Sequence, residues 1–509
     1  MMRLSIRPQC DFDIAVVGAG PAGAAAAAHL ARSGLRVGLL DAWAFPRDKV
    51  CGDFVSPVGL MELNRLGVTR LPGFRRSNPI HRAAVFVDGQ ELITSPIPEV
   101  AGLPSHGRVV PRKVLDDWIL GVARDAGAKL LEGFRVRHFE VTADCVTLTA
   151  DSPAGTRNLC ARALVGADGS NSLVARLVRG RPVPDEDRII AVRAYFEGVD
   201  GPADQADLYF TGASFPGYYW LFPTGPSTAN VGVGMVLETL PRTAEHLRAL
   251  LSRLIESDAA LSARLRRATL VDKVVGWPLT TYSPGLQIIG ERLLLVGDAA
   301  GLINPLNGEG IQYALLSARW AADTLVACAG RDDFSRSALE PYAARVHGAV
   351  RYDMALAAMI VQLIRNRSLN PLWLQALKVI IARARVDPSY ADLTGGVLAG
   401  LVPAASVISG KIVVDTLKQA AISSGFGLAS RALRGPQQIA RLGTDLGSLV
   451  GDALVTALRN PGEFLMWCVA VGTSGVELAG QIARHAIAPR RDGAGPGEHA
   501  TALRLVVQQ

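Results

Sequence analysis

Three closely spaced glycines near the start of the chain follow a short apolar run. Residues 13–18 (DIAVVG) predict a strand, and the next residues complete a GxGxxG turn before an alanine-rich stretch that predicts a helix. Gly18 permits the tight turn, Gly20 lets a pyrophosphate approach the backbone, and Gly23 lets helix and strand pack closely. The free amides at the start of such a helix attract phosphate. The predicted pyrophosphate-binding residues are Gly18, Gly20, Pro21, Ala22 and Gly23.

An acidic residue follows at the distance that a nucleotide site requires. A second apolar run, residues 36–40, predicts another strand and ends at Asp41, 18 residues after Gly23. A carboxylate at this place can accept hydrogen bonds from the ribose hydroxyls of an adenosine. The order of strand, helix and strand predicts a dinucleotide-binding domain. NAD and FAD proteins share this motif, however, and a glycine-rich turn can also be purely structural.

Two later motifs help to distinguish the two dinucleotides. Residues 165–169 (VGADG) and 295–300 (LVGDAA) each end a short predicted strand, and residues 304–311 (NPLNGEGI) follow the second of them. Asp298 is placed to bind the ribitol hydroxyls of a flavin, and the glycine turn opens a helix whose positive end can stabilise charge on reduced flavin. A site for NAD alone needs neither motif, so FAD is favoured. The structural alternatives are a helix N-cap at Asp298 and a turn-stabilising role for Asp168.

Together these motifs resemble the geranylgeranyl reductase family, within the larger group of para-hydroxybenzoate-hydroxylase-like flavoproteins. The resemblance spans residues 10–405 and includes residues 45–52 (FPRDKVCG) and the pair Pro111 and Arg112 before a predicted helix. It implies that FAD is the cofactor and that the glycine turn and Asp41 hold its ADP half. The residues implied at the flavin half are Cys51, Gly52, Arg112, Asp298, Gly310 and Ile311, and we also assign Val136 to the cofactor site.

An aromatic segment, residues 218–223 (YYWLFP), resembles the YxWxFP signature of the same family. In a strand, Tyr218, Trp220 and Phe222 point to one face and form a flat wall that can hold an isoprenoid chain over the flavin. The alternative is that these rings are the aromatic core of a sheet. We predict Tyr218, Trp220 and Cys51 as catalytic residues, with Tyr218 as a candidate proton donor. For Cys51 the alternative is a small buried apolar side chain.

The order of the predicted elements indicates the fold class. We expect an α/β FAD-binding Rossmann-like domain of the GR2 type, interleaved with an antiparallel β-sheet substrate domain and followed by a C-terminal helical region. Residues 10–80, 105–180 and 280–340 are assigned to the FAD-binding domain, residues 81–104 and 181–279 to the substrate-binding sheet, and residues 341–509 to the helical region.

Two late segments raise the question of membrane contact. Residues 393–410 include no charge but contain glycines and a proline, and residues 464–476 form a shorter uncharged run. Neither matches the about 20 apolar residues of a spanning helix. A spanning helix is therefore the least favoured alternative, behind ordinary buried helices and a helix that lies on the membrane interface. We expect a cytoplasmic protein that can bind peripherally to the inner face of the membrane.

The composition limits the other classes of function. The chain has 509 residues, 49% of them hydrophobic, a net charge of +7 and a mean hydropathy of +0.24. Its basic residues form no long run and no stripe with interleaved aromatics, so nucleic-acid binding is not predicted. The 6 cysteines lack CxxC spacing, so neither a disulfide framework nor a metal site is predicted.

The leading functional hypothesis is saturation of carbon–carbon double bonds in a prenyl chain by hydride transfer from N5 of reduced FAD. The substrate is then a geranylgeranyl lipid or a polyprenyl quinone. The same scaffold also suits an FAD-dependent monooxygenase that hydroxylates or epoxidises an apolar or aromatic substrate, a halogenase with Lys49 as its lysine, or a non-catalytic electron-transfer or membrane-docked protein. The electron donor stays open between NAD(P)H, a ferredoxin-like protein and a quinol, because no second GxGxxG follows a predicted strand.

Overall fold

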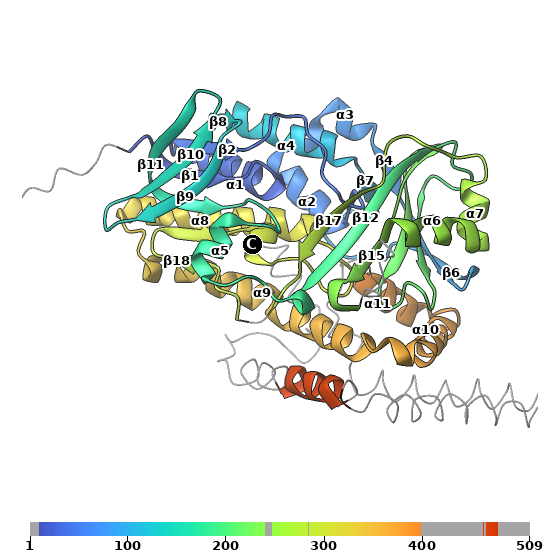
Figure 1. The fold of residues 1–509 in the computed structure, drawn as a ribbon. Helices are drawn as coiled ribbons and strands as arrows, with labels where there is room; N and C mark the ends of the chain where they lie inside the picture. Colours follow the sequence, from blue (N-terminus) through green and yellow to red (C-terminus); the bar gives the residue numbers. More distant parts are fainter. Residues whose placement is uncertain (1–9, 240–246, 284, 399–461, 463–464, 477–509) are drawn as a thin grey trace, which may run out of the picture.

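Two β-sheets lie side by side, and a long helical segment runs beneath both of them (Figure 1). The computed structural model describes residues 10–239, 247–283, 285–398, 462 and 465–476. The first sheet and its helices are built from three separate parts of the chain, and the second sheet is inserted between them. The chain thus passes back and forth between the two halves, and the loops at their junction come from distant parts of the sequence.

The first sheet has a parallel centre with strand order β19, β11, β1, β2 and β8. Its edge strand β18 and the β9–β10 hairpin, which pairs with β11, are antiparallel. The carboxyl ends of the parallel strands lie along one edge, which is where α/β proteins bind ligands. The strands are β1 (Phe12–Val17), β2 (Val37–Asp41), β8 (Lys129–Glu132), β9 (Arg135–Val141), β10 (Val146–Ser152), β11 (Gly155–Gly166), β18 (Ile289–Gly290) and β19 (Leu293–Leu295).

Helix α1 (Pro21–Arg32) begins directly after β1 and packs between α4 (Arg112–Asp125) and α8 (Ile311–Arg331). Its side chains from Ala24 to Ala28 are fully buried, and their small size lets α1 lie close to its neighbours. The starts of α1 and α8 therefore both lie near the carboxyl edge of the sheet.

The second sheet has the strand order β16, β12, β15, β14, β13, β5 and β6, with β17 paired to β12. It is antiparallel except for the parallel pair β5–β13. Helices α6 (Leu247–Ser257) and α7 (Ala259–Leu265) pack on one face, where they share an apolar core with Tyr219 and Leu221. The strands are β5 (Arg82–Val87), β6 (Gln90–Pro96), β12 (Arg188–Glu197), β13 (Gln205–Phe210), β14 (Tyr218–Gly225), β15 (Thr228–Val236), β16 (Thr269–Leu270) and β17 (Val275–Thr280).

Smaller elements connect the two halves. A three-stranded sheet consists of β3 (Phe54–Val55), β7 (Gly107–Val109) and β4 (Asn78–Ile80). Helices α2 (Pro57–Leu66), α3 (Pro72–Arg75) and α5 (Leu173–Arg179) and the short 3₁₀ helices Val68–Arg70, Asp185–Asp187, Leu237–Thr239, Gly297–Ala300 and Arg367–Leu369 complete this part. A buried ion pair between Arg319 of α8 and Glu62 of α2 joins them at 2.9 Å.

The segment beneath both sheets consists of α9 (Arg336–Ile364), α10 (Asn370–Ala384) and α11 (Pro388–Leu398) (Figure 1). Helix α9 contacts α8 and β18, and α10 contacts β6, so the segment touches both halves. A further helical stretch is described at residues 465–476. Among the described helices, none has the length and hydropathy needed to cross a membrane.

The predicted fold class, with a Rossmann-like α/β part, an interleaved sheet and a helical C-terminal region, is confirmed. Two details differ from the prediction: the second sheet is mixed, and helices α6 and α7 lie within the segment predicted as sheet. The boundaries of the three domains stay a prediction. Most of residues 393–410, and Phe464, lie outside the described residues.

Candidate active site

A cavity of about 1830 Å³ extends from the carboxyl edge of the first sheet, past the second sheet, to helices α9–α11. Ligand pockets in proteins usually measure about 300–1,000 Å³, so this cavity has room for more than one small molecule. Almost every residue predicted for the site lines it: Gly18, Gly20, Pro21, Ala22, Asp41, Cys51, Gly52, Arg112, Val136, Tyr218, Trp220, Asp298, Gly310 and Ile311. Gly23 is the exception.

The glycines of the first motif have different roles. Gly18 has φ +102°, and a Cβ atom there would lie 2.3 Å from Ala167 O. A Cβ atom on Gly23 would lie 1.8 Å from Gly18 O, so this glycine permits helix α1 to pack on the turn. At Gly20 a Cβ atom would meet only the tip of Arg47, at 3.7 Å. The protein itself therefore does not require glycine at position 20, whereas a phosphate against the free amides of α1 does.

Asp41 ends strand β2 beside this turn. Its carboxylate accepts hydrogen bonds from the backbone N–H groups of Ala19 (2.8 Å) and Trp43 (2.9 Å), and Arg47 lies 3.6 Å away. These bonds fix the carboxylate and leave it free acceptor capacity, because two carboxylate oxygens offer about four lone-pair sites. Val136 of β9 also lines the cavity and is almost fully buried.

The aspartates of the second and third motifs both line the cavity, but they have different partners. The Asp168 carboxylate accepts hydrogen bonds from Leu173 N (2.7 Å), Val174 N and Ser172 Oγ, and so caps helix α5. Asp298 instead lies 3.5 Å from Lys49 Nζ, and its carboxylate accepts a hydrogen bond from Ser170 Oγ at 3.0 Å. Asp168 thus has the turn-stabilising contacts of the structural alternative, although it also lines the cavity.

The loop of residues 45–53 is held between the two sheets. The side-chain amide of Asn230, fully buried on β15, donates hydrogen bonds to Cys51 O (2.7 Å) and to Asp53 Oδ2 (2.8 Å). Tyr195 also donates to Asp53 Oδ2, at 2.6 Å. Burial raises the pKa of the Cys51 thiol, so the neutral thiol is its stable form.

Arg112, at the start of α4, lies behind this loop. It donates two hydrogen bonds to the carboxylate of Asp116, at 2.6 and 2.9 Å, and both side chains are buried. The bidentate pair stabilises the guanidinium group where it lines the cavity and keeps the pKa of Arg112 raised, although burial opposes this.

The aromatic side chains of β14 alternate between two environments. Tyr218, Trp220 and Phe222 line the cavity, and the Trp220 and Phe222 rings are stacked with centroids 6.1 Å apart. Tyr219, between them in the sequence, stacks on Tyr209 in the core beneath α6 and α7. The Trp220 Nε1–H group donates to Asn230 Oδ1 at 2.9 Å, which links the wall to the loop of residues 45–53.

Two carboxyl groups at the cavity, Asp53, which is fully buried, and Glu309, which is half-buried with its Oε1 atom buried, were not among the predicted site residues. Burial raises the pKa of Glu309 to about 8, against the effect of a hydrogen bond from Ser56. Burial raises the pKa of Asp53 to about 6, although Tyr195 and Asn230 lower it. In the described part of the chain, Glu309 Oε1 and Asp53 Oδ1 have no hydrogen-bond partner. Glu309 lies inside the NPLNGEGI motif, so its position was visible in the sequence but its burial was not.

The far end of the cavity was also not predicted. It is lined by apolar side chains of α9–α11, which include Ile360, Ile364, Trp373, Leu377, Ile381 and Val397. A helix with apolar residues on all sides is predicted to be buried, but the pattern does not show which elements or ligands it packs against. The sequence therefore gave no reason to connect these helices with the site.

Comparison with known proteins identifies the family. Residues 11–351 match the model of the FAD binding domain family. The chain is 38% identical over 343 residues to a menaquinone reductase of Mycolicibacterium smegmatis, covering 64% of this chain and 78% of that protein. It is 31% identical over 328 residues to a geranylgeranyl diphosphate reductase of Rhodobacter capsulatus, covering 62% of this chain and 75% of that protein. The chain belongs to the geranylgeranyl reductase family of FAD-dependent oxidoreductases.

The fold agrees with this assignment. The crystal structure of a geranylgeranyl bacteriochlorophyll reductase-like protein from Thermoplasma acidophilum superimposes on this flavoprotein with a TM-score of 0.62 at 22% identity, covering 73% of this chain and 91% of that chain. FAD is the cofactor of this flavoprotein, and the space at Gly20 and the uncapped start of α1 suit its pyrophosphate.

Gly20→Val tests this arrangement. The valine side chain fills space that the protein leaves open, so we expect the variant to fold but to bind FAD at least about tenfold more weakly, because one hydrogen bond to a charged group contributes about 1.5–3 kcal/mol. Flavin absorbance per protein and a fluorescence titration of FAD measure this. The control is Gly121→Val on α4, where a Cβ atom meets no neighbour within 4 Å. Wild-type flavin content in Gly20→Val would contradict the assignment.

Proposed function

We propose that this flavoprotein saturates carbon–carbon double bonds in the chain of a prenyl lipid, with a polyprenyl quinone as its first candidate substrate. The observation that carries the proposal is the continuity of the cavity, which leads from the glycine turn past the aromatic wall into an apolar end between α9 and α11. An extended prenyl chain suits such a space, since its burial removes apolar surface from water along its whole length. The identity to a protein named menaquinone reductase supports the choice of a quinone.

The residues around the glycine turn would hold the cofactor. Gly20 and the start of α1 would hold the pyrophosphate, Asp41 and Val136 the adenosine, and Asp298 the ribitol, while Arg112, Cys51, Gly310 and Ile311 would lie at the flavin ring. Bound and reduced FAD supplies a hydride. Tyr218, Trp220 and Phe222 would align the double bond against the ring, because an isolated alkene accepts a hydride only when it is well oriented and protonated.

We assign the proton to Glu309. Its buried Oε1 has no partner, and its raised pKa keeps the carboxyl group protonated at neutral pH. Glu309 would transfer its proton to one carbon of the double bond as the hydride adds to the other, and then recover a proton from solvent. The hydroxyl of Tyr218 donates to Asn307 O at 2.6 Å, and burial raises its pKa, so we give Tyr218 the role of positioning the 307–309 turn. Asp53 is largely ionised at pH 7 and is a poorer acid.

The halogenase alternative has less support in this geometry. Lys49, the lysine considered for it, pairs with Asp298 at 3.5 Å. A monooxygenase remains the alternative that the experiment below distinguishes. The electron donor is open between NAD(P)H, a ferredoxin-like protein and a quinol.

An anaerobic product assay tests the function. Dithionite-reduced enzyme is mixed with a menaquinone that carries an unsaturated chain, the reaction is quenched, and the head group is then reoxidised in air before mass spectrometry. Each saturated bond adds about two mass units that survive head-group reoxidation. The Gly20→Val variant, which should bind less FAD, is the control and should give less of this product at the same protein concentration. Hydroxylated or epoxidised product that requires oxygen during the reaction would assign the protein to the monooxygenases.

Glu309→Gln tests the acid. We expect kcat to fall about 10²–10⁴-fold with KM and flavin content nearly unchanged, because general acid catalysis contributes a factor of this size. In the wild type, activity is present while the carboxyl is protonated and falls as the pH rises through about 8; the variant should lose this decrease. Tyr218 and Tyr313, which also face Glu309, stay neutral there because burial raises their pKa values.

Asp53→Asn is the matched comparison. If the wild-type rate instead fell as the pH rose through about 6, and Asp53→Asn removed that decrease, Asp53 and not Glu309 would be the acid.

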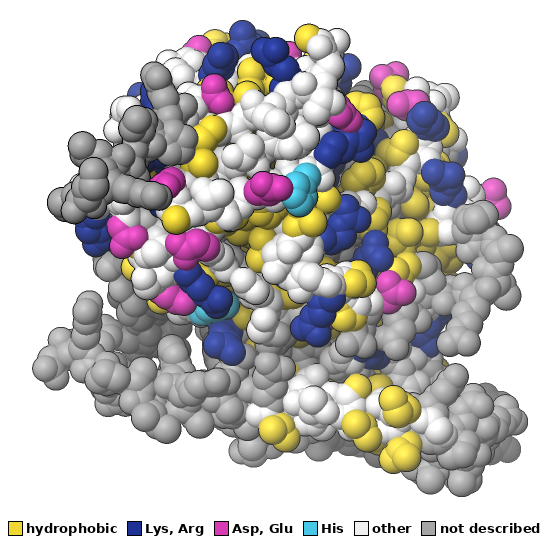
Figure 2. All heavy atoms as spheres, turned by 60° about the vertical axis from the view of Figure 1, so that its left-hand side comes forward, with side chains coloured by type: hydrophobic (Ala, Val, Ile, Leu, Met, Phe, Trp, Pro, Cys, Tyr) yellow, Lys and Arg dark blue, Asp and Glu magenta, His cyan; other side chains and the backbone are white. Residues whose placement is uncertain are grey.

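We also propose peripheral membrane contact through residues 465–476. This helical stretch has no charged residue, and Leu465, Met466 and Val469 are between 55% and 69% exposed. In Figure 2 it lies below the main body, and its coloured side chains are all apolar. Contact at this place would bring an apolar substrate near the protein without a spanning helix.

Changing Leu465, Met466 and Val469 together to serine tests the membrane contact. We expect binding to phosphatidylglycerol-containing vesicles to fall by at least about tenfold in a sedimentation assay, because full burial of one such side chain contributes about 1.5–3 kcal/mol. Val271→Ser, at an equally exposed residue beside the second sheet, is the control. If the triple variant bound vesicles as well as the wild type does, this segment would not be the membrane contact.

A further inference from the structure

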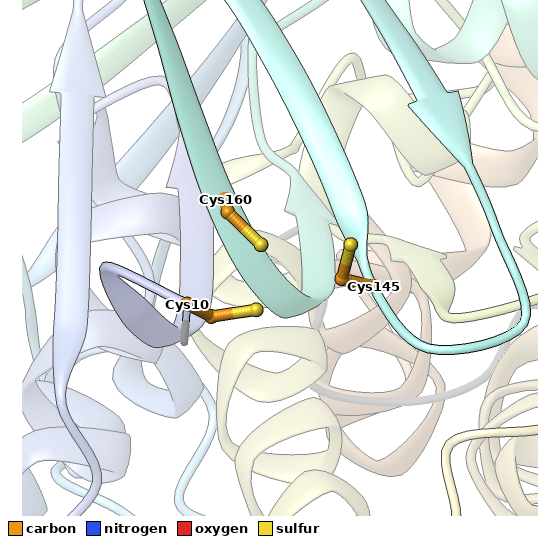
Figure 3. A group of neighbouring side chains, drawn as sticks. All are labelled: Cys10, Cys145 and Cys160. Carbon is orange, nitrogen blue, oxygen red and sulfur yellow. The ribbon is translucent and has the colours of Figure 1, made fainter. Parts of the chain in front are cut away.

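Three cysteines that are far apart in the sequence lie together at the first sheet. Their sulfur atoms are all within 4.8 Å of one another, and all three thiols are free (Figure 3). Cys10 precedes β1, Cys145 precedes β10, and Cys160 lies on β11. Figure 3 shows the three side chains pointing toward a common point between these strands.

The strand register explains why they meet. β11 lies between β1 and β10, and its residue Ala161 pairs with Phe12 on one side and with Val146 on the other. Cys10 lies two residues before Phe12, and Cys145 and Cys160 lie one residue before Val146 and Ala161, respectively. The convergence therefore follows from the pairing of the sheet, and a scan for short cysteine spacings cannot detect it.

The backbones of all three cysteines are fixed by hydrogen bonds. Arg36 Nη1 donates to Cys10 O at 3.1 Å, Cys145 N donates to Thr142 Oγ1 at 3.1 Å, and Cys160 N donates to an oxygen of the Asp11 carboxylate at 2.8 Å. Cys10 and Cys145 are less than a tenth exposed, and Cys160 is half-buried. The thiols are thus held in place and shielded, with access left on the side of Cys160.

We propose that Cys10, Cys145 and Cys160 form a binding site for a thiophilic metal ion of the zinc type. Three thiolates around one Zn²⁺ at about 2.3 Å have sulfur atoms about 3.8 Å apart, which the observed spacing accommodates with small side-chain rotations. No histidine or carboxylate among the described residues joins the group, so the fourth position falls to water. A ligand set of thiolates alone selects soft ions such as Zn²⁺ or Cu⁺ over Mg²⁺ or Ca²⁺.

The geometry also indicates what the ion does. None of the three cysteines lines the large cavity, and Cys10 lies at the amino end of β1, whereas Gly18 lies beyond its carboxyl end. An ion there joins the entry of β1 to the β10–β11 hairpin. The site is therefore a structural clamp on the first sheet, and the proposal does not depend on the reaction that the cavity carries out.

Surrounding groups suit a thiolate-bound ion. The Thr142 hydroxyl lies 3.6 Å from Cys145 Sγ, within reach of a hydrogen bond to a ligating sulfur. The Arg36 guanidinium group lies against Cys10 and offsets the negative charge that three thiolates leave on a divalent ion. Such partners orient metal ligands in known sites.

A metal titration of the full-length, FAD-loaded protein tests the proposal. The protein is purified with a reductant, treated with a chelator, and titrated with Co²⁺, whose thiolate complexes absorb in the red where oxidised flavin does not. We expect one equivalent of Co²⁺ to give this absorption and Zn²⁺ to remove it. Elemental analysis of untreated protein should give one zinc or one copper per chain. Which of the two is found identifies the ion that the protein binds in the cell.

Variants connect the signal to the three thiols. Cys145→Ser and Cys160→Ser should each weaken Co²⁺ binding by at least about a hundredfold, because losing a ligand costs more than the 10–100-fold effect of a neighbouring group. Cys468→Ser, at an exposed cysteine elsewhere, should leave it unchanged. Because Cys160 is only half-buried, Cys160→Ser is the variant least at risk of misfolding. Flavin absorbance shows whether each variant folds.

Either of two titration results would overturn the proposal, as would a third, chemical finding. One is a folded wild type that takes up neither Co²⁺ nor Zn²⁺ and contains no copper. The other is a Co²⁺ signal that persists in Cys160→Ser. A disulfide between two of the three cysteines in protein isolated without oxidant would equally replace the metal site.

Discussion

The Asn230 side chain connects the two halves of this flavoprotein. Its amide group is fully buried, donates to Cys51 O and Asp53 Oδ2, and accepts from Trp220 Nε1. A buried amide is costly unless its hydrogen bonds are made, so the loop of residues 45–53 and the aromatic wall must take up their places together. Asn230 of β15, together with the Tyr195 hydroxyl that also donates to Asp53 Oδ2, consequently holds the loop of residues 45–53 in one fixed relation to the aromatic wall.

The same junction contains groups that stability alone does not explain. Among the residues that the structure describes, no group pairs with the buried Oδ1 of Asp53 or the buried Oε1 of Glu309, and such burial costs free energy in a folded protein. Proteins accept such costs mainly where a group must act on a ligand. The two carboxyls differ in environment, because Asp53 receives two hydrogen bonds that favour its charged form while Glu309 receives one from Ser56. At neutral pH the pKa values of about 6 and about 8 make Asp53 mostly a carboxylate and Glu309 mostly a carboxylic acid within the same cavity.

The sequence was most informative where structure depends on local rules. The turn at Gly18–Gly23, the strand end at Asp41 and the alternation of Tyr218, Trp220 and Phe222 require only the geometry of single strands and turns, and the structure brings these residues to one cavity. Other features depend on tertiary packing. The burial of Glu309, the helices α6 and α7 and the apolar end formed by α9–α11 follow from which elements meet. The triad of cysteines is the clearest case, since its members lie up to 150 residues apart and meet through sheet register alone.

The large cavity is encoded in two parts of the chain that can vary separately. Its glycine-turn end lies within residues 11–351, the part that matches the common FAD-binding family, whereas Ile360, Trp373, Leu377 and Val397 at its apolar end follow that segment. Substitutions in the later helices can lengthen, shorten or reshape the apolar end while the flavin end keeps its geometry. A flavoprotein of this kind can therefore change the size and shape of what it binds through substitutions in helices that carry none of the cofactor motifs.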